Sequence, residues 1–163
     1  MIRKAELSDV PRIAEIRVFG WRNAYRGIVS DDILFCEKLV STDIPRFESL
    51  IQSTDSESYV FDDGIIKASM TIGACRDEDK PDTLELWAIY VEPLMKGQGI
   101  GSILVDYCEA LAIERGYKEI CLWVLEQNDS SRRFYEKMGF VVDGTSKFLE
   151  HVEVMEVRYT KEL

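Results

Sequence analysis

The most informative segment of the sequence is Lys96-Gly-Gln-Gly-Ile-Gly-Ser102. An apolar run over residues 84–91 precedes it and predicts a β-strand, and residues 103–115 follow it with apolar side chains at helical spacing. A glycine-rich turn between a strand and a helix points several backbone N–H groups, together with the positive end of the helix dipole, at one place. The sequence therefore predicts an anion site at residues 96–102, and the usual ligand of such a site is a phosphate.

Two common phosphate-binding motifs do not fit the spacing of these glycines. A Walker loop requires Gly, four residues and then Gly-Lys-Ser/Thr, and this string is absent from the sequence. A dinucleotide-binding fingerprint requires Gly-x-Gly-x-x-Gly, but Ser102 or Leu104 stands where the last glycine should be. The pattern that remains is Lys96-x-x-Gly99-x-Gly101.

A second segment, Asn128-Asp-Ser-Ser-Arg-Arg-Phe-Tyr-Glu-Lys-Met-Gly-Phe140, predicts a short helix. Asn128 is a favourable N-cap, Phe134 and Met138 share one face, and Gly139 suits a left-handed position at the C-terminus. Together the two segments resemble the two signatures of the GCN5-related N-acetyltransferase (GNAT) superfamily. These signatures are Arg or Gln, two residues, Gly, one residue and Gly or Ala, followed later by an Asn-capped helix that carries Phe-Tyr-Glu-Lys and ends in Gly-Phe. The alternative is that both segments are turn–helix units that serve packing alone.

The order of the predicted elements agrees with this resemblance, because strands come first, partly as hairpins, and helices then alternate with strands. The resemblance implies an α/β (α+β) fold in one domain over residues 1–163, with a mixed, mostly antiparallel sheet of six to seven strands flanked by helices. Residues 21–28 resemble the first helix and turn of a small, single-domain bacterial branch. The fourth and fifth strands, residues 84–91 and 118–125, are expected to splay apart and admit the thioester arm of acetyl-CoA. The other expected elements are a strand over 2–5, helices over 8–25, 31–39 and 45–52, strands over 58–61 and 65–75, a polar loop over 76–82, and final strands over 140–142 and 150–159.

Composition and charge narrow the class of function. The chain is 46% hydrophobic and 31% charged, which is ordinary for a globular domain. Its net charge of −10 argues against nucleic acid or an anionic membrane as the partner and favours a cationic acceptor. The sequence has no run of transmembrane length, no apolar signal core and no Cys-x-x-Cys pair among its 4 cysteines. We therefore expect a cytoplasmic protein with reduced, buried thiols and no metal site.

The resemblance implies acetyl-CoA as the acetyl donor and indicates how the chain holds it. Backbone N–H groups of residues 97–102 would bind the diphosphate, since glycines let the backbone approach closely. Lys96 stands where the superfamily usually has Arg or Gln, and it supplies charge without the planar fork of arginine. The main chain of residues 89–91 would pair with the pantetheine amides, whereas the side chains there belong to the core. Asn128 is a candidate cofactor contact, although its role as the N-cap already explains it, and the two roles are compatible. The candidate cofactor-binding residues are Ile89, Tyr90, Val91, Lys96, Gly97, Gln98, Gly99, Ile100, Gly101, Ser102, Asn128 and Lys137.

Acetyl transfer to an amine also needs an acid for the departing thiolate and a base for the amine. Tyr135 occupies the general-acid position of the superfamily, and a phenol with a pKa of about 10 is protonated at pH 7. Glu85 is the candidate base because it interrupts an apolar strand and, in simple alternation, shares a face with Trp87 and Ile89. A charged residue there should face a wet cleft or a partner, and an exposed surface glutamate is the alternative.

The candidate residues for the acceptor pocket are Trp21, Tyr25 and Ile28, with Lys147 as a further candidate near the C-terminus. Aromatic residues four positions apart also occur in ordinary cores, so packing is the alternative. The lone His151 has no nucleophile or metal ligand beside it and is expected to be structural or to face solvent.

The function implied by the resemblance is acetyl-CoA-dependent N-acetyltransfer to a small-molecule or peptide amine. We expect direct attack in a ternary complex, because no Cys or Ser stands with a His base in a recognisable arrangement. The alternative is a catalytically inactive acyl-CoA-binding sensor or structural subunit with the same fold. The resemblance also allows a homodimer, and nothing in residues 19–50 or 140–155 selects one amine over another.

Overall fold

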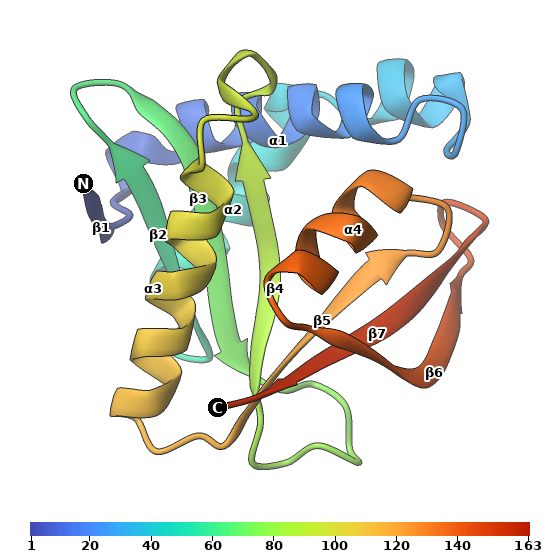
Figure 1. Ribbon diagram of the computed structural model, residues 1–163. Helices are drawn as coiled ribbons and strands as arrows, with labels where there is room; N and C mark the ends of the chain where they lie inside the picture. Colours follow the sequence, from blue (N-terminus) through green and yellow to red (C-terminus); the bar gives the residue numbers. More distant parts are fainter.

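The computed structural model describes residues 1–163 and contains one seven-stranded sheet with helices on both faces (Figure 1). No helix combines the length and the apolar character that crossing a bilayer requires. Three short helical turns, Leu7–Asp9, Ile33–Glu37 and Pro93–Met95, connect the longer elements. The strands are β1 (Ile2–Lys4), β2 (Ser56–Asp62), β3 (Ile66–Ala74), β4 (Leu84–Val91), β5 (Glu119–Leu125), β6 (Val141–Leu149) and β7 (Val154–Glu162), and the helices are α1 (Val10–Ala24), α2 (Val40–Gln52), α3 (Ile100–Glu114) and α4 (Asp129–Lys137).

The strand order is β1-β2-β3-β4-β5-β7-β6, and every neighbouring pair is antiparallel except β4–β5, which is parallel. The β4–β5 ladder consists only of Leu84 opposite Ile120 and Glu85 opposite Cys121. Beyond these pairs the two strands diverge, so the expected splay of the fourth and fifth strands is confirmed. The divergence leaves the backbone of residues 86–91 without a partner strand on the side that faces β5.

A β-bulge in β4 changes which side chains share a face. Thr71 of β3 lies opposite Ala88, but the next residue of β3 lies opposite Leu86, so Trp87 is an extra residue in β4. Leu86 and Ile89 consequently point to the same face, where both belong to the main core cluster. Simple alternation across this segment is therefore wrong, and the bulge places Glu85 on the other face of the sheet.

Apolar clusters cover both faces of the sheet. The larger cluster lies between the strands and α3, with Leu104 and Cys108 of α3 fully buried and the aromatic residues of α4 packed at its edge. A smaller cluster packs α1 and α2 against β2, and its central residues are Ile13, Phe47 and Val60. Helices α3 and α4 thus cover one face, and α1 and α2 cover the other (Figure 1).

Several expected boundaries are corrected by the structure. Helix α2 begins at Val40 instead of residue 45, and the helix expected over 31–39 is present over residues 31–37, where it has π-helical hydrogen bonding from Ile33. Strand β6 was expected to end at residue 142 but continues to Leu149. A bulge that contains Gly144, with φ +91°, interrupts the alternation of its side chains and does not end the strand. Cys36 is exposed and Cys75 is half-buried, so the expectation of buried thiols is correct only for the other two cysteines, Cys108 and Cys121. His151 is exposed, as expected.

A partly exposed ion pair between β2 and the end of α3 should make stability depend on pH. Glu57 on β2 bonds to Arg115 at the end of α3 (2.6 Å) and accepts a hydrogen bond from Tyr59 (2.9 Å). Burial alone would raise the pKa of Glu57, but the hydrogen bonds from Arg115, Tyr59 and Lys4 outweigh it and lower the pKa to about 2. Because an unfolded glutamate has a pKa of about 4.3, this carboxylate stabilises the fold above that pH, and the contribution is lost as the pH falls toward 2.

We expect Glu57→Gln to lower the free energy of unfolding at pH 7 by about 1 kcal/mol, a value reduced for solvent screening of this partly exposed pair. The difference between the variant and the original chain should shrink as the pH falls from 4.5 to 2. Urea unfolding at pH 7 and at pH 3 measures both effects. An equal difference at the two pH values would mean that the pair does not titrate as described.

Candidate active site

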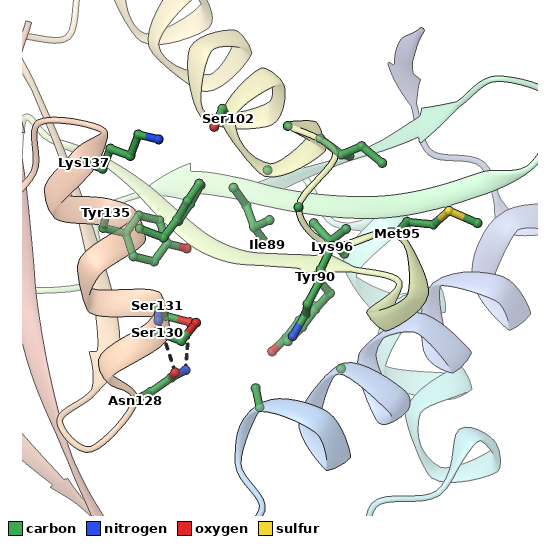
Figure 2. A pocket seen from close by; sticks show the side chains of 18 of the residues that line it. Ile89, Tyr90, Met95, Lys96, Ser102, Asn128, Ser130, Ser131, Tyr135 and Lys137 are labelled. Carbon is green, nitrogen blue, oxygen red and sulfur yellow. Dashed lines mark hydrogen bonds between the residues drawn. The ribbon is translucent and has the colours of Figure 1, made fainter.

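A cavity of about 430 Å³ opens where the end of β4, the N-terminus of α3, α4 and the C-terminal turn of α1 meet (Figure 2). Most of the candidate site residues line it, although they come from three separate parts of the chain. The candidates on its wall are Tyr25, Ile89, Tyr90, Val91, Lys96, Gly97, Gly99, Ile100, Gly101, Ser102, Asn128, Tyr135 and Lys137. Gly20, Ala24, Met95, Ser130, Ser131 and Phe134 complete the wall and were not among the candidates.

The glycine loop has the geometry of an anion site. Gly97 and Gly99 have φ values of +80° and +79°, a backbone conformation that residues with a Cβ adopt at a cost. The backbone N–H groups of residues 97–102 have no partner among the backbone hydrogen bonds. They open the 15-residue helix α3, whose N-terminus receives no side-chain cap. Free donors at the positive end of a helix dipole fit a phosphate group.

Lys96 crosses the mouth of the cavity toward α1. Its ammonium group donates a hydrogen bond to Oδ1 of Asn23 (2.7 Å), and burial lowers the pKa of Lys96. The side chain therefore links the glycine loop to the helix on the opposite wall. Gln98 does not line the cavity, and its amide makes only a 3.5 Å contact to the sulfur of Met95.

Asn128 begins α4 and is almost fully buried. Its Oδ1 accepts a hydrogen bond from the backbone N–H of Ser131 (3.2 Å), and its Nδ2 contacts Oγ of the same serine (2.9 Å; Figure 2). Both polar groups of this side chain are thus engaged in capping the helix. The cap fixes the start of α4 and with it the direction in which the helix presents Tyr135.

Tyr135 projects from α4 into the cavity, and its hydroxyl points toward the centre of the space between α4 and β4 (Figure 2). Its ring packs edge-on against Phe134 and Phe140 at centroid distances of 5.0 and 5.8 Å. No hydrogen bond within the protein uses the hydroxyl. Burial, together with the neighbouring Tyr90 and Cys108, raises the pKa of Tyr135, so the phenol keeps its proton at neutral pH.

Glu85 does not line this cavity: of the two expected surroundings, a wet cleft or a partner, it has a partner, and it is not the exposed surface residue of the alternative. The residue is 1% exposed, and both of its carboxylate oxygens are bonded to Arg76. The backbone N–H and the Nε of Arg76 each donate to Oε2 at 3.0 Å, and Nη2 donates to Oε1. The bulge at Trp87 also places Glu85 on the face opposite to Ile89. The carboxylate therefore stabilises the loop that follows β3, through its bonds to Arg76.

We therefore expect Glu85→Gln to act on stability and not on the acid–base chemistry. The variant loses the charge that pairs with Arg76 and should lower the free energy of unfolding by about 2 kcal/mol. The pH dependence of kcat should keep its shape, because no proton of the amine passes through this residue. A pH profile of the variant beside that of the original chain checks the claim, and a lost ascending limb would restore Glu85 as the base.

The three acceptor-pocket candidates have different surroundings. Tyr25 lines the cavity and packs edge-on against Trp21 at 4.9 Å. Trp21 itself lies behind the wall, where its Nε1 donates a hydrogen bond to the hydroxyl of Tyr90 (3.1 Å). Ile28 is not on the wall and packs against a small cluster that includes Val29. Burial and the nearby hydroxyls of Tyr90 and Tyr135 raise the pKa of Tyr25. Of the three candidates, Tyr25 lines the cavity, Trp21 contacts it through Tyr90, and Ile28 does neither.

Sequence reasoning missed Arg17, which lies one helical turn before Trp21 in α1 and is 3% exposed. Its guanidinium forms an ion pair with Asp43 of α2 and lies 4.7 Å from the centre of the Trp21 ring. A signal was available, because Arg17 occupies a helical position otherwise filled by the apolar stripe of Val10 and Ile13. A charge in such a stripe requires a buried partner.

Comparison with known proteins agrees with this geometry. Residues 31–140 match the model of the acetyltransferase (GNAT) family. A probable N-acetyltransferase of Mycobacterium tuberculosis is 30% identical over 164 residues, which cover 97% of this chain and 91% of that protein. The spermidine N(1)-acetyltransferase of Thermoplasma acidophilum is 27% identical over 146 residues, covering 88% and 89% of the two chains.

The fold is also that of a solved acetyltransferase. PaiA N-acetyltransferase from Thermoplasma acidophilum, whose crystal structure is in complex with coenzyme A, superposes with a TM-score of 0.76 at 21% identity. The superposition covers 100% of this chain and 98% of that one, and a likeness at this identity shows a common fold. With most of the chain matched by the family model, the chain belongs to the acetyltransferase (GNAT) family and is an N-acetyltransferase with acetyl-CoA as its donor.

Proposed function

We propose that the chain transfers the acetyl group of acetyl-CoA directly to an amine, with the glycine loop as the diphosphate site and Tyr135 as the general acid. The observation that carries this proposal is that one cavity contains both the free N–H groups of residues 97–102 and the unpartnered hydroxyl of Tyr135. The same cavity therefore combines a binding site for an anionic cofactor with a proton donor. The proposal assigns residues 1–163 to one catalytic domain, since all seven strands join one sheet.

Each part of the cavity has a separate task in the proposal. The N–H groups of the glycine loop bind the diphosphate, and Lys96 and Lys137 add positive charge at that end. The backbone of residues 89–91, which β5 leaves unpaired, forms hydrogen bonds with the pantetheine amides as a neighbouring strand would. These contacts direct the thioester into the gap between β4 and β5.

The reaction is an exchange of bonds at the thioester carbon. Acetyl-CoA supplies the acetyl group: the amine nitrogen forms a C–N bond with its carbonyl carbon, and the C–S bond breaks. Tyr135 gives its proton to the departing sulfur, and the phenol recovers a proton from solvent. Glu85 has no part in this step, because Arg76 holds its carboxylate. The acceptor ammonium loses one proton to water before the neutral amine attacks, and the nitrogen loses a second proton to water as the amide forms.

This route predicts how the rate depends on pH. An alkyl ammonium has a pKa of about 10.4, so the fraction of neutral amine grows as the pH rises toward that value. The raised pKa of Tyr135 keeps the acid protonated over the same range. We expect kcat/KM to rise from pH 7 to pH 9 without a descending limb. A fall above pH 8 on a stable enzyme would mean that the acid titrates earlier than its buried setting requires.

The acceptor class in this proposal is a small-molecule or peptide amine. A relative that acts on spermidine supports an amine, and the alternative of an inactive acyl-CoA-binding sensor would leave the free Tyr135 hydroxyl without a function.

We propose a cytoplasmic location, because the exposed thiol of Cys36 stays reduced in that compartment. We also propose a homodimer, supported by the exposed apolar side chains of edge strand β6, Val141, Val142 and Phe148.

The test is release of free thiol from acetyl-CoA in the presence of a panel of amines. Thiol release that depends on both the enzyme and the amine supports the transferase. Binding of coenzyme A without release for any amine, at any pH between 7 and 9, would contradict it and favour the sensor.

A further inference from the structure

Three basic side chains, and one carboxylate that pairs with one of them, lie on or between α1 and α2. Arg17 of α1 forms an ion pair with Asp43 of α2, and both side chains are almost completely buried. Lys38, in the segment between these helices, places its ammonium 4.7 Å from the centre of the Trp21 ring, the same ring that Arg17 contacts at 4.7 Å. Arg46 lies one helical turn after Asp43 in α2, on the same side of that helix. We call Arg17, Lys38 and Arg46 the basic cluster.

The basic cluster has more positive charge than its own carboxylate balances. Asp43 is engaged by Arg17, and neither Lys38 nor Arg46 forms an ion pair. The chain has ten more acidic than basic residues, so this local excess is opposite to the overall charge. Nε of Arg17 is buried and has no hydrogen-bond partner, the only such side-chain atom in the structure.

The positive charges of the basic cluster also repel one another, which destabilises their charged forms. Burial lowers the pKa of Lys38, and the neighbouring charges of Arg17 and Arg46 lower it further. Partial burial and the charge of Arg17 lower the pKa of Arg46 in the same direction. Cations held close together at an energetic cost are typical of a binding site, since an anion placed among them removes the repulsion.

The position of the basic cluster relates it to the acceptor. Its neighbour Tyr90 lines the cavity, accepts the hydrogen bond from Trp21 and lies with its ring 5.8 Å from the Arg17 guanidinium. The end of α1 forms part of the cavity wall through Gly20, Ala24 and Tyr25, so we place the path of the acceptor beside α1, the helix that carries Arg17. The basic cluster therefore borders the path of the acceptor.

We infer that the acceptor carries an anionic group, a carboxylate or a phosphate, in addition to its amine, and that the basic cluster binds this group. The inference rests on the proposed function, since it names the acceptor class of the same site. An aminocarboxylate or aminophosphate would balance the excess positive charge of Lys38 and Arg46, which form no ion pair within the protein. A polyamine such as spermidine would instead bring further positive charge to three cations, so the local charge opposes the cationic acceptor that the net charge favoured.

The experiment compares pairs of acceptors that differ only in the anionic group. β-Alanine is paired with propylamine, an α-amino acid with its amide, and phosphoethanolamine with ethanolamine, and spermidine is added as a polycation. We expect kcat/KM for the anionic member of at least one pair to exceed that of its neutral partner by about 10-fold or more. The pair with the larger ratio distinguishes a carboxylate from a phosphate. Calorimetric titration of each acceptor into the enzyme saturated with coenzyme A gives the same comparison without turnover.

Two variants test whether the basic cluster causes the preference for anionic acceptors. The double variant Lys38→Met with Arg46→Gln should remove the preference for the anionic member and leave neutral amines within about twofold of the original enzyme. It leaves the buried Arg17–Asp43 pair intact and so should fold normally. Lys118→Met removes an exposed lysine just before β5 and should leave the kcat/KM ratio of every acceptor pair unchanged.

The outcomes distinguish failure of the inference about the anionic acceptor from failure of the proposed acetyl transfer. If neutral amines and spermidine react as fast as the anionic acceptors, the proposed function stands and the inference is overturned. If the double variant keeps the anionic preference, the basic cluster does not bind that group, and the inference is again overturned. If no amine of either kind is acetylated although coenzyme A binds, the proposed function itself fails.

Discussion

Tyr135→Phe is expected to lower kcat by about 100-fold or more and to leave the Kd for coenzyme A unchanged. The hydroxyl is the only group that the substitution removes, and it has no hydrogen-bond partner in the protein. The phenylalanine ring keeps the edge-on contacts with Phe134 and Phe140, so the fold should be preserved. Without a proton donor, the thiolate must leave unprotonated or take its proton from water, and the transfer slows.

The matched control for this variant is Tyr107→Phe. Tyr107 lies in α3, packs edge-on against Tyr59 at 5.4 Å and lies outside the cavity. It should retain full activity. Steady-state thiol release and calorimetry with coenzyme A on both variants separate chemistry from binding. Unchanged turnover in Tyr135→Phe would show that another group protonates the thiolate.

Gly99→Ala is expected to weaken the binding of acetyl-CoA by about 10-fold or more. The backbone of Gly99 is left-handed with φ +79°, which costs an alanine about 1–2 kcal/mol. A Cβ at this position would meet no protein atom within 4 Å, because it would extend into the open space next to the free N–H groups. The methyl group would thus obstruct the diphosphate, and any relaxation of φ would turn the donors away from it.

Gly64→Ala separates cofactor binding from backbone strain. Gly64 also has a positive φ (+105°) with no protein atom within 4 Å of a Cβ, but it lies in the β2–β3 turn, outside the cavity. Both variants should lose similar stability in urea unfolding, whereas only Gly99→Ala should lose affinity in calorimetry. Equal affinity for acetyl-CoA in the two variants would contradict the assignment of the diphosphate to the glycine loop.

The parts of the site that could be predicted from the sequence are those encoded by local patterns. The glycine loop follows from positions 97, 99 and 101 between a strand and a helix, and the start of α4 follows from the capping ability of Asn128. The splay of β4 and β5 came from the resemblance to the family, since no local pattern in residues 84–91 or 119–125 reports where a ladder stops.

The remaining features depend on contacts between distant segments. The extra residue Trp87 is visible only in the register with β3, so alternation placed Glu85 on the wrong face. Its partner Arg76 lies in a loop that sequence patterns described only as polar. The basic cluster depends on how α2 approaches α1, and the sequence placed the start of α2 too late at residue 45. Propensities and periodicities describe single elements and do not contain such packing information.

The central claim is that the cavity beside the glycine loop binds the acetyl donor. Calorimetric titration of the protein with acetyl-CoA, coenzyme A and ATP in parallel tests this claim most directly. We predict that both CoA species bind with similar affinity and that ATP, which has phosphates but no pantetheine arm for the β4 edge, does not. Absence of binding for both CoA species would contradict the assignment of the site and the mechanism built on it.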